Sequence, residues 1–144
     1  MPSLTLDSDT RATVAAALAG EDWVVACLCA GWCTTCGAYR ASFDALAQRH
    51  ADKLFVWIDI EDQAEVVGEL DVENFPTLLV QRRDTVAFFG TVLPDAGVAE
   101  HLLHAMSTQS GAELAALASS SAERRAWQRD CNLLQLLNAS DAAR

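Results

Sequence analysis

Four of the chain's five cysteines lie close together, in the segment CLCAGWCTTC at positions 27–36. Clustered cysteines form structural disulfides, bind metal ions or carry out reversible thiol–disulfide exchange. Cys33 and Cys36 have Cys-x-x-Cys spacing, which places the second sulfur one helical turn from the first if a helix begins there. A helix start also favours the thiolate form of a cysteine. The segment lies between a predicted strand and a predicted helix, so we interpret this pair as a redox centre.

Other interpretations of the cluster stay open at this point. Cys33 and Cys36 are two reduced core cysteines in the simplest alternative. Cys27 and Cys29 lie on the same side of a predicted strand and suit small, buried, apolar packing. A metal site built from Cys29, Cys33 and Cys36 has ligand-like spacing, but its fourth ligand must be Cys27 or a distant residue. We therefore predict no metal.

Composition and charge limit the partners. The chain has 144 residues, of which 51% are apolar, and its formal net charge is −10. Phosphate binding needs a basic surface, so nucleic acid is not an expected partner. The N-terminal residues MPSLTLDSDTR lack the basic and apolar regions of a signal peptide, and no run is long enough to span a membrane. We expect a cytoplasmic protein, where structural disulfides are rare.

Strands and helices alternate along the first 107 residues. This order predicts an α/β fold with a mixed central sheet flanked by helices on both faces. The strand at 23–29, WVVACLC, is apolar throughout and should be buried on both faces. The predicted elements are strands at 4–6, 23–29, 53–60, 75–83 and 85–92, and helices at 10–19, 34–50, 61–72 and 95–106.

A C-terminal extension, 108–144, follows the predicted domain of residues 1–107. Two capping-box patterns predict helices at 111–118 and 121–138. The second helix carries an apolar stripe that must be buried on its own domain, in a homodimer or against a partner. The stripe consists of Trp127, Cys131, Leu134 and Asn138, with Leu133, Leu136 and Leu137 beside it.

The chain resembles the thioredoxin family in three places. The motifs are WCTTC at 32–36, FPT at 75–77 and Gly90, and they occur in the order and at the spacing of thioredoxins. The similarity covers residues 4–106 and implies a thioredoxin fold for the domain, with the helical extension added to it.

The resemblance also implies roles for individual residues. Cys33 would be the attacking thiol and Cys36 the resolving thiol, and the two would form the redox-active disulfide. Trp32 and Phe75 would lie on the substrate-binding side, with Pro76 as a cis-proline that binds extended substrate backbone. A trans proline at the start of a strand is the alternative for Pro76.

The chain departs from the family pattern at several positions. Thr34 and Thr35 stand where thioredoxins usually have Gly-Pro. The buried aspartate that assists proton transfer falls on Cys27, its usual lysine neighbour falls near Trp57, and a helix-kinking proline falls on Ala41. A buried thiol relays protons less well than a carboxylate. We therefore expect a thioredoxin-fold redox protein that is not a general-purpose thioredoxin.

These observations predict a cytosolic thiol–disulfide oxidoreductase that acts on protein disulfides through Cys33 and Cys36. It needs no cofactor of its own, and an external reductase or small thiol would supply electrons. The alternative is a chaperone, assembly factor or binding module with little redox turnover. Seven acidic residues and no basic ones lie between Asp59 and Glu73. They form either a solvated helix face or a surface that attracts basic partners.

Overall fold

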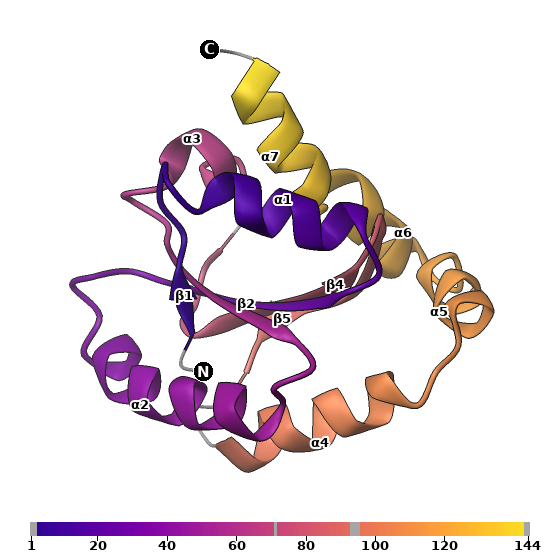
Figure 1. The fold of residues 1–144 in the computed structure, drawn as a ribbon, viewed down its shortest axis with the longest axis horizontal. Coiled ribbons are helices and arrows are strands. Elements are labelled where there is room, and N and C mark those ends of the chain that lie inside the picture. Colours follow the sequence, from indigo (N-terminus) through magenta and orange to yellow (C-terminus); the bar gives the residue numbers. More distant parts are fainter. Residues whose placement is uncertain (1–2, 71, 93–95, 143–144) are drawn as a thin grey trace.

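The structure, a computed structural model, describes residues 3–70, 72–92 and 96–142. Its described strands form one mixed sheet in the order β1-β3-β2-β4-β5, which confirms the predicted architecture (Figure 1). β1, β3 and β2 are parallel, whereas β4 and β5 are antiparallel to their neighbours. The strands are β1 (Leu4–Thr5), β2 (Trp23–Cys29), β3 (Leu54–Asp59), β4 (Thr77–Arg82) and β5 (Thr85–Thr91).

Helices cover both faces of the sheet (Figure 1). In this view α1, α3 and α7 lie above the sheet, α2 and α4 lie below it, and α5 and α6 pack against β5. Within the described ranges, no helix combines the length and apolar character needed to cross a membrane. The helices are α1 (Arg11–Ala19), α2 (Thr34–Arg49), α3 (Ala64–Val67), α4 (Ala96–Ser107), α5 (Gly111–Ala118), α6 (Ala122–Asp130) and α7 (Leu133–Ala142).

Strand β2 is buried on both faces, as its apolar sequence predicts. Side chains alternate along a strand, so neighbouring residues enter different cores. Val24, Ala26 and Leu28 belong to the core under α1 and α7, where they pack with Val14 and Leu133. Cys27 and Cys29 face the other way, into the core between the sheet and the helices α2 and α4. That second core includes Val25, Cys27, Cys29, Cys36, Tyr39, Phe43, Leu46 and Leu103.

The helix that follows β2 is fixed by a tight turn. The backbone N–H of Cys33 donates to the carbonyl of Ala30 at 3.0 Å, and the N–H of Gly37 donates to the carbonyl of Cys33 at 3.2 Å. Cys33 is therefore the N-cap residue, and the helix predicted at 34–50 is confirmed to within one residue. This turn places Cys36 in the first turn of α2.

The acidic helix predicted at 61–72 is wrong in length. Of the residues in this range that the structure describes, only those of α3 form a helix, and its C-cap residue is Gly68. Glycine has high backbone entropy and weak helix propensity, which favours ending the helix there. The two valines of this short helix, Val66 and Val67, are buried in the core under α1.

The C-terminal extension packs on its own domain. Trp127, Leu133 and Leu137 are buried in the same core as α1, which confirms that interpretation of the apolar stripe. The homodimer contact predicted as an alternative is therefore not supported. The single helix predicted at 121–138 is wrong, because the chain breaks into α6 and α7. The break occurs at Asn132, whose side-chain oxygen accepts from the N–H of Gln135 at 3.2 Å and so caps the second helix.

A buried polar network joins this break to the sheet. Gln81 of β4 is fully buried, and its amide nitrogen donates to the side-chain oxygen of Asn132 at 2.8 Å. Its side-chain oxygen accepts from the backbone N–H of Leu133, also at 2.8 Å. The Asn132 amide nitrogen in turn donates to the side chain of Asp84 at 2.7 Å. Every polar atom of the two amides is satisfied, so the network fixes where α7 begins.

A second amide from the extension pairs with the edge of the sheet. The Gln128 side-chain oxygen accepts from the backbone N–H of Val86 at 2.8 Å. Its amide nitrogen donates to the Val86 carbonyl at 2.9 Å. The side chain therefore makes the two hydrogen bonds that a residue of a neighbouring strand would make with β5.

The buried network predicts a stability effect. Asn132→Ala should lower the free energy of unfolding by about 1–3 kcal/mol, because it leaves buried partners without hydrogen bonds. Asn138→Ala is the matched control, since Asn138 is exposed on α7, and it should change stability by less than about 0.5 kcal/mol. Urea unfolding followed by circular dichroism measures both. Equal effects of the two substitutions would contradict the role of the network.

Candidate active site

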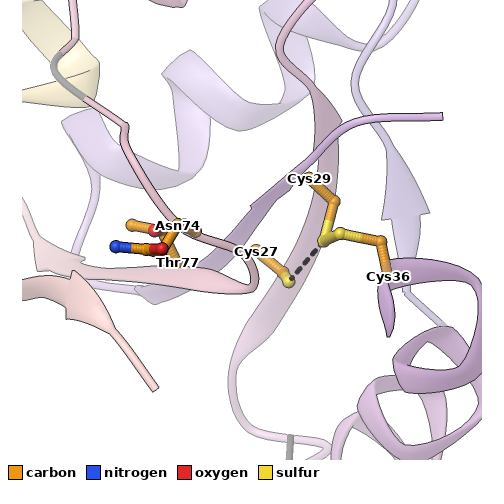
Figure 2. The surroundings of a disulfide bond; sticks show 5 residues. All are labelled: Cys27, Cys29, Cys36, Asn74 and Thr77. Atoms are coloured by element: carbon orange, nitrogen blue, oxygen red, sulfur yellow. Dashed lines mark hydrogen bonds between the residues drawn. A yellow bond between two sulfur atoms is a disulfide. The ribbon is translucent and has the colours of Figure 1, made fainter. Parts of the chain in front are cut away.

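The cysteine cluster contains a disulfide between Cys29 and Cys36 (Figure 2). Their Cα atoms lie 5.8 Å apart, within the range usual for disulfides. Cys33 is a free, partly exposed thiol. The predicted Cys33–Cys36 disulfide is therefore not the bond present in this structure. The physical reason is strand alternation, which points Cys29 at the first turn of α2, where Cys36 lies.

Cys27 lies beside this disulfide as a buried thiol. Its sulfur is 3.8 Å from the sulfur of Cys29, as the dashed line in Figure 2 shows. Burial raises the pKa of the Cys27 thiol, and the Arg40 guanidinium lowers it by a smaller amount. Cys27 therefore stays protonated at neutral pH. The prediction of buried apolar packing is confirmed for Cys27, whereas for Cys29 it is wrong, because that sulfur is bonded.

Cys27 and its neighbours lack the aspartate and lysine that the resemblance to thioredoxins implies at these positions. In the β2–β3 register, Trp57 lies opposite Cys27. The Arg40 guanidinium lies over the Trp57 ring at 4.7 Å from its centroid, and the Phe43 ring lies 5.7 Å from it. The family's aspartate and lysine are thus replaced by a thiol and an indole. The carboxylate that would relay a proton at this position is missing from the site.

Cys33 directly follows Trp32 in the chain, and Trp32 contacts a second aromatic residue. Trp32 is 71% exposed, and its ring meets the ring of Phe75 edge-on at 5.7 Å between centroids. The Phe75–Pro76 peptide bond is cis. Cys33 and Phe75 both pack against the core that contains Cys29 and Cys36. The structure therefore brings the five predicted site residues to one end of the sheet, while their roles stay predictions.

Acidic groups border this end of the sheet. The indole N–H of Trp32 donates to the carboxylate of Glu61. Asp59 ends β3 opposite Cys29, and its carboxylate accepts from the backbone N–H groups of Glu61 and Asp62 at 2.9 and 3.2 Å. These contacts hold a negatively charged loop next to Trp32. The site consequently has an acidic border on the side of β3.

A shallow cleft of about 250 Å³ adjoins the proline loop. The hydroxyl of Thr77 donates to the carbonyl of Asn74 at 2.7 Å and so holds the loop before β4. The exposed carboxylate of Glu73 adds to the acidic character of this surface. The cleft is lined by Glu73, Asn74, Thr77, Phe89, Gly90 and Thr91.

The alternative metal site, built from Cys29, Cys33 and Cys36, can be compared with the structure. Across the described residues, no group of three or more histidine, cysteine, aspartate or glutamate side chains is arranged to hold a metal ion. Two of the sulfurs that this alternative needs, those of Cys29 and Cys36, are bonded to each other.

The fold and the site together define a class of protein. A mixed sheet of this order, a Cys-x-x-Cys at the β2–α2 junction and a cis-proline before β4 describe a thioredoxin-fold protein with a cysteine-based site. The sequence model of the Thioredoxin family matches residues 6–101, which is two thirds of the chain. The chain therefore belongs to the thioredoxin family.

Individual relatives are similar over part of the chain. "Thioredoxin-like protein CXXS1" of Oryza sativa subsp. japonica is 36% identical over 64 residues, which cover 44% of this chain and 48% of that protein. "Thioredoxin" of Homo sapiens is 29% identical over 72 residues, covering 50% of this chain and 69% of that protein. The chain thus spans about half the length of the first relative and somewhat more than two thirds of the second.

A solved structure shows the same fold. It is a chain from the complex of ferredoxin:thioredoxin reductase and thioredoxin f2, which superposes with a TM-score of 0.59 and 22% identity. The superposition covers 74% of this chain and 93% of that chain. This likeness supports the predicted thioredoxin fold.

Sequence reasoning missed two features of the site. The sequence predicts packing or metal binding for Cys29, although its position on the α2 face of β2 indicates that it lies near Cys36. The contact between Trp32 and Glu61 had no signal in the sequence beyond the acidic run, because it depends on how the loop after β3 turns.

Thiol accessibility should distinguish the three free cysteines. In the native chain with Cys29 and Cys36 bonded, we expect one thiol, that of Cys33, to react quickly with a disulfide reagent at pH 8. Cys27 and Cys131 are buried, and burial together with Asp130 raises the pKa of Cys131 to about 11. The thiolate reacts, so both should react slowly until the chain unfolds.

The count of reacted thiols per chain tests this expectation. It should be one in the native state and three in guanidinium chloride. Cys131→Ser should reduce only the count after unfolding, and Cys33→Ser should remove the rapid reaction. Rapid reaction that persists in Cys33→Ser would contradict the assignment.

Proposed function

We propose that the protein is a thiol–disulfide oxidoreductase that acts on protein disulfides, with Cys33 as the attacking sulfur. The observation that carries this proposal is the position of Cys33. It occupies the N-cap position of α2, it is the partly exposed cysteine of the cluster, and it directly follows Trp32, whose ring contacts Phe75 before the cis-proline. A protein segment that docks on the exposed Trp32 ring would bring its disulfide to this sulfur.

The reaction begins when both Cys33 and Cys36 are thiols. The Cys33 thiolate attacks one sulfur of the substrate disulfide, and the other substrate sulfur leaves as a thiolate. Cys36 then loses its proton and attacks Cys33, which releases the second substrate sulfur. The substrate gains two electrons, and the protein is left with a Cys33–Cys36 disulfide. The buried Cys27 thiol offers no carboxylate to accept the proton of Cys36, so we expect the resolving step to be slow.

An external donor must return two electrons to the protein. A thioredoxin reductase or a small thiol would do so by dithiol exchange, without any cofactor bound to this chain. The fold likeness to a chain from a complex with ferredoxin:thioredoxin reductase supports a reductase as donor. The cytoplasmic location expected from the sequence is part of this proposal, and fractionation of the native cells tests it.

A binding module is the second candidate function. It is favoured by the bonding of Cys36 to Cys29, which leaves Cys33 without its resolving thiol. In that state Cys33 can hold a partner covalently but cannot release it through Cys36. Because the extension buries its apolar stripe on its own domain, a partner would bind at the cysteine end of the sheet.

Trapping tests the role of Cys33. Cys36→Ser should capture partner proteins from lysate as mixed disulfides, because the resolving thiol is removed and Cys33 remains. Cys33→Ser should capture none under the same conditions. Non-reducing gels with and without dithiothreitol measure the difference. Equal capture by both variants, together with no turnover of a disulfide substrate by the wild type, would exclude the oxidoreductase.

Charge near Trp32 should influence substrate choice. Glu61→Gln keeps a hydrogen-bond acceptor for the Trp32 indole and removes one negative charge. We expect kcat/KM to fall about two- to fivefold at low salt for a peptide disulfide flanked by lysines, because steering of a basic substrate weakens. The difference should shrink at high salt, where exposed charges are screened.

The matched control for this experiment is Glu123→Gln, an exposed position in the first turn of α6, outside the cysteine cluster at 27–36. It should leave kcat/KM for the basic peptide unchanged. If the two variants behave alike, the acidic border has no part in substrate choice and is a solvated surface.

A further inference from the structure

We propose that Cys29 is a third redox-active sulfur and that Cys36 exchanges between two partners, Cys29 inside the core and Cys33 at the surface. This inference deepens the proposed function, on which it rests for the role of Cys33 as the attacking sulfur. It gives the protein two oxidised forms, an internal disulfide between Cys29 and Cys36 and a surface disulfide between Cys33 and Cys36.

The first observation is the burial of the internal disulfide. Cys29 is 1% exposed and Cys36 is 2% exposed, so a thiol in solution cannot reach either sulfur directly. Among the described cysteines, Cys33 is the one that is not buried, and it packs against the core that contains both bonded sulfurs. A reductant or substrate thiol must therefore gain access through Cys33 or after local opening of α2.

The second observation is the geometry around Cys36. The residue is the third of α2, in its first turn, three positions after the N-cap residue Cys33. On one side, the Cα atom of Cys29 is 5.8 Å away. On the other side, Cys33 lies one helical turn along the chain, the spacing that lets two cysteines form a disulfide. One sulfur is thus placed to bond with either of two neighbours.

The exchange between the two forms is balanced without any oxidant. Cys33 loses its proton to solvent, and its thiolate attacks the sulfur of Cys36. A Cys33–Cys36 bond forms, the Cys29–Cys36 bond breaks, and Cys29 leaves with the electron pair and takes up a proton. One thiol and one disulfide are present before and after, so the step is an isomerisation.

This exchange determines what the oxidised protein can do. With the disulfide inside, Cys33 is a single free thiol that forms mixed disulfides and has no resolving partner. With the disulfide at the surface, the same chain accepts electrons from an external dithiol. The chain with the internal disulfide is therefore an oxidised form that small thiols reduce slowly.

Disulfide mapping tests the proposal on the full-length protein. The chain is oxidised, quenched in acid, unfolded and treated with N-ethylmaleimide, and it is then cleaved with chymotrypsin. Cleavage after Trp32 separates Cys29 from the peptide that carries both Cys33 and Cys36. An internal disulfide joins two peptides, whereas a surface disulfide lies within one, so mass spectrometry distinguishes them. We expect the cross-linked peptides with N-ethylmaleimide on Cys33.

Single substitutions test the exchange step. Cys33→Ser should form the internal disulfide and lose it to glutathione at least about tenfold more slowly than the wild type, because the attacking sulfur is absent. Cys29→Ser should form only the surface disulfide. Cys27→Ser, the matched control on the same face of β2, should retain the wild-type peptide map. Circular dichroism confirms that each variant is folded.

The outcomes that overturn the proposal are specific. They are an oxidised wild type with the surface disulfide alone, a folded Cys33→Ser that forms no internal disulfide, or a Cys33→Ser disulfide that glutathione reduces at the wild-type rate. None of these results depends on a protein substrate. If mapping succeeds but the wild type turns over no disulfide substrate, the proposed function fails while the exchange stands. If the wild type turns over a disulfide substrate but mapping finds no internal disulfide, the proposed function stands and the exchange is excluded.

Discussion

The complete burial of β2 is the constraint on which the site depends. β2 lies between two neighbouring strands with helices over both faces of the sheet, and its side chains from Val24 to Cys29 are all buried in a core. Alternation then sends Cys27 and Cys29 to the α2 side, where the helix starts within disulfide distance of Cys29. The cysteine with an exposed part, Cys33, lies beyond the end of the strand. Within the segment 27–36, the sulfurs of Cys27, Cys29 and Cys36 are therefore buried, and Cys33 is partly exposed.

The extension stabilises this arrangement from the opposite face. Its apolar residues complete the core under α1, and the buried amides of Gln81 and Asn132 determine where α7 starts. Apolar packing alone tolerates shifts along a helix, whereas a buried hydrogen-bond network allows a single register. The other face of β2 is therefore covered by a layer whose position is fixed, and the strand that carries the cysteines is held between two ordered cores.

Much of the fold could be predicted from the sequence, because it depends on local patterns. The limits of β2 and α2 follow from an apolar run, a turn and a helical repeat, and the mixed sheet follows from the order of the elements. Strand alternation indicates that Cys29 lies near the start of α2, but its bond to Cys36 could not be predicted, since it depends on how closely α2 approaches the end of β2. The break at Asn132 was also missed, because its cause is a hydrogen bond to Gln81, 51 residues away in the sequence. Contacts between residues far apart in the sequence are not indicated by the local pattern of residue types.

The side chain of Gln128 has a consequence for how other chains can meet this protein. Unpaired strand edges are where sheets add foreign strands. At Val86 of β5, the hydrogen-bonding positions are filled by an amide from the protein's own extension. The opposite edge, β1, offers only two residues in the described part of the chain. A foreign strand therefore cannot pair with β5 at Val86, because the protein's own extension already occupies those hydrogen-bonding groups. The extension thus protects this part of the sheet edge from association with other chains.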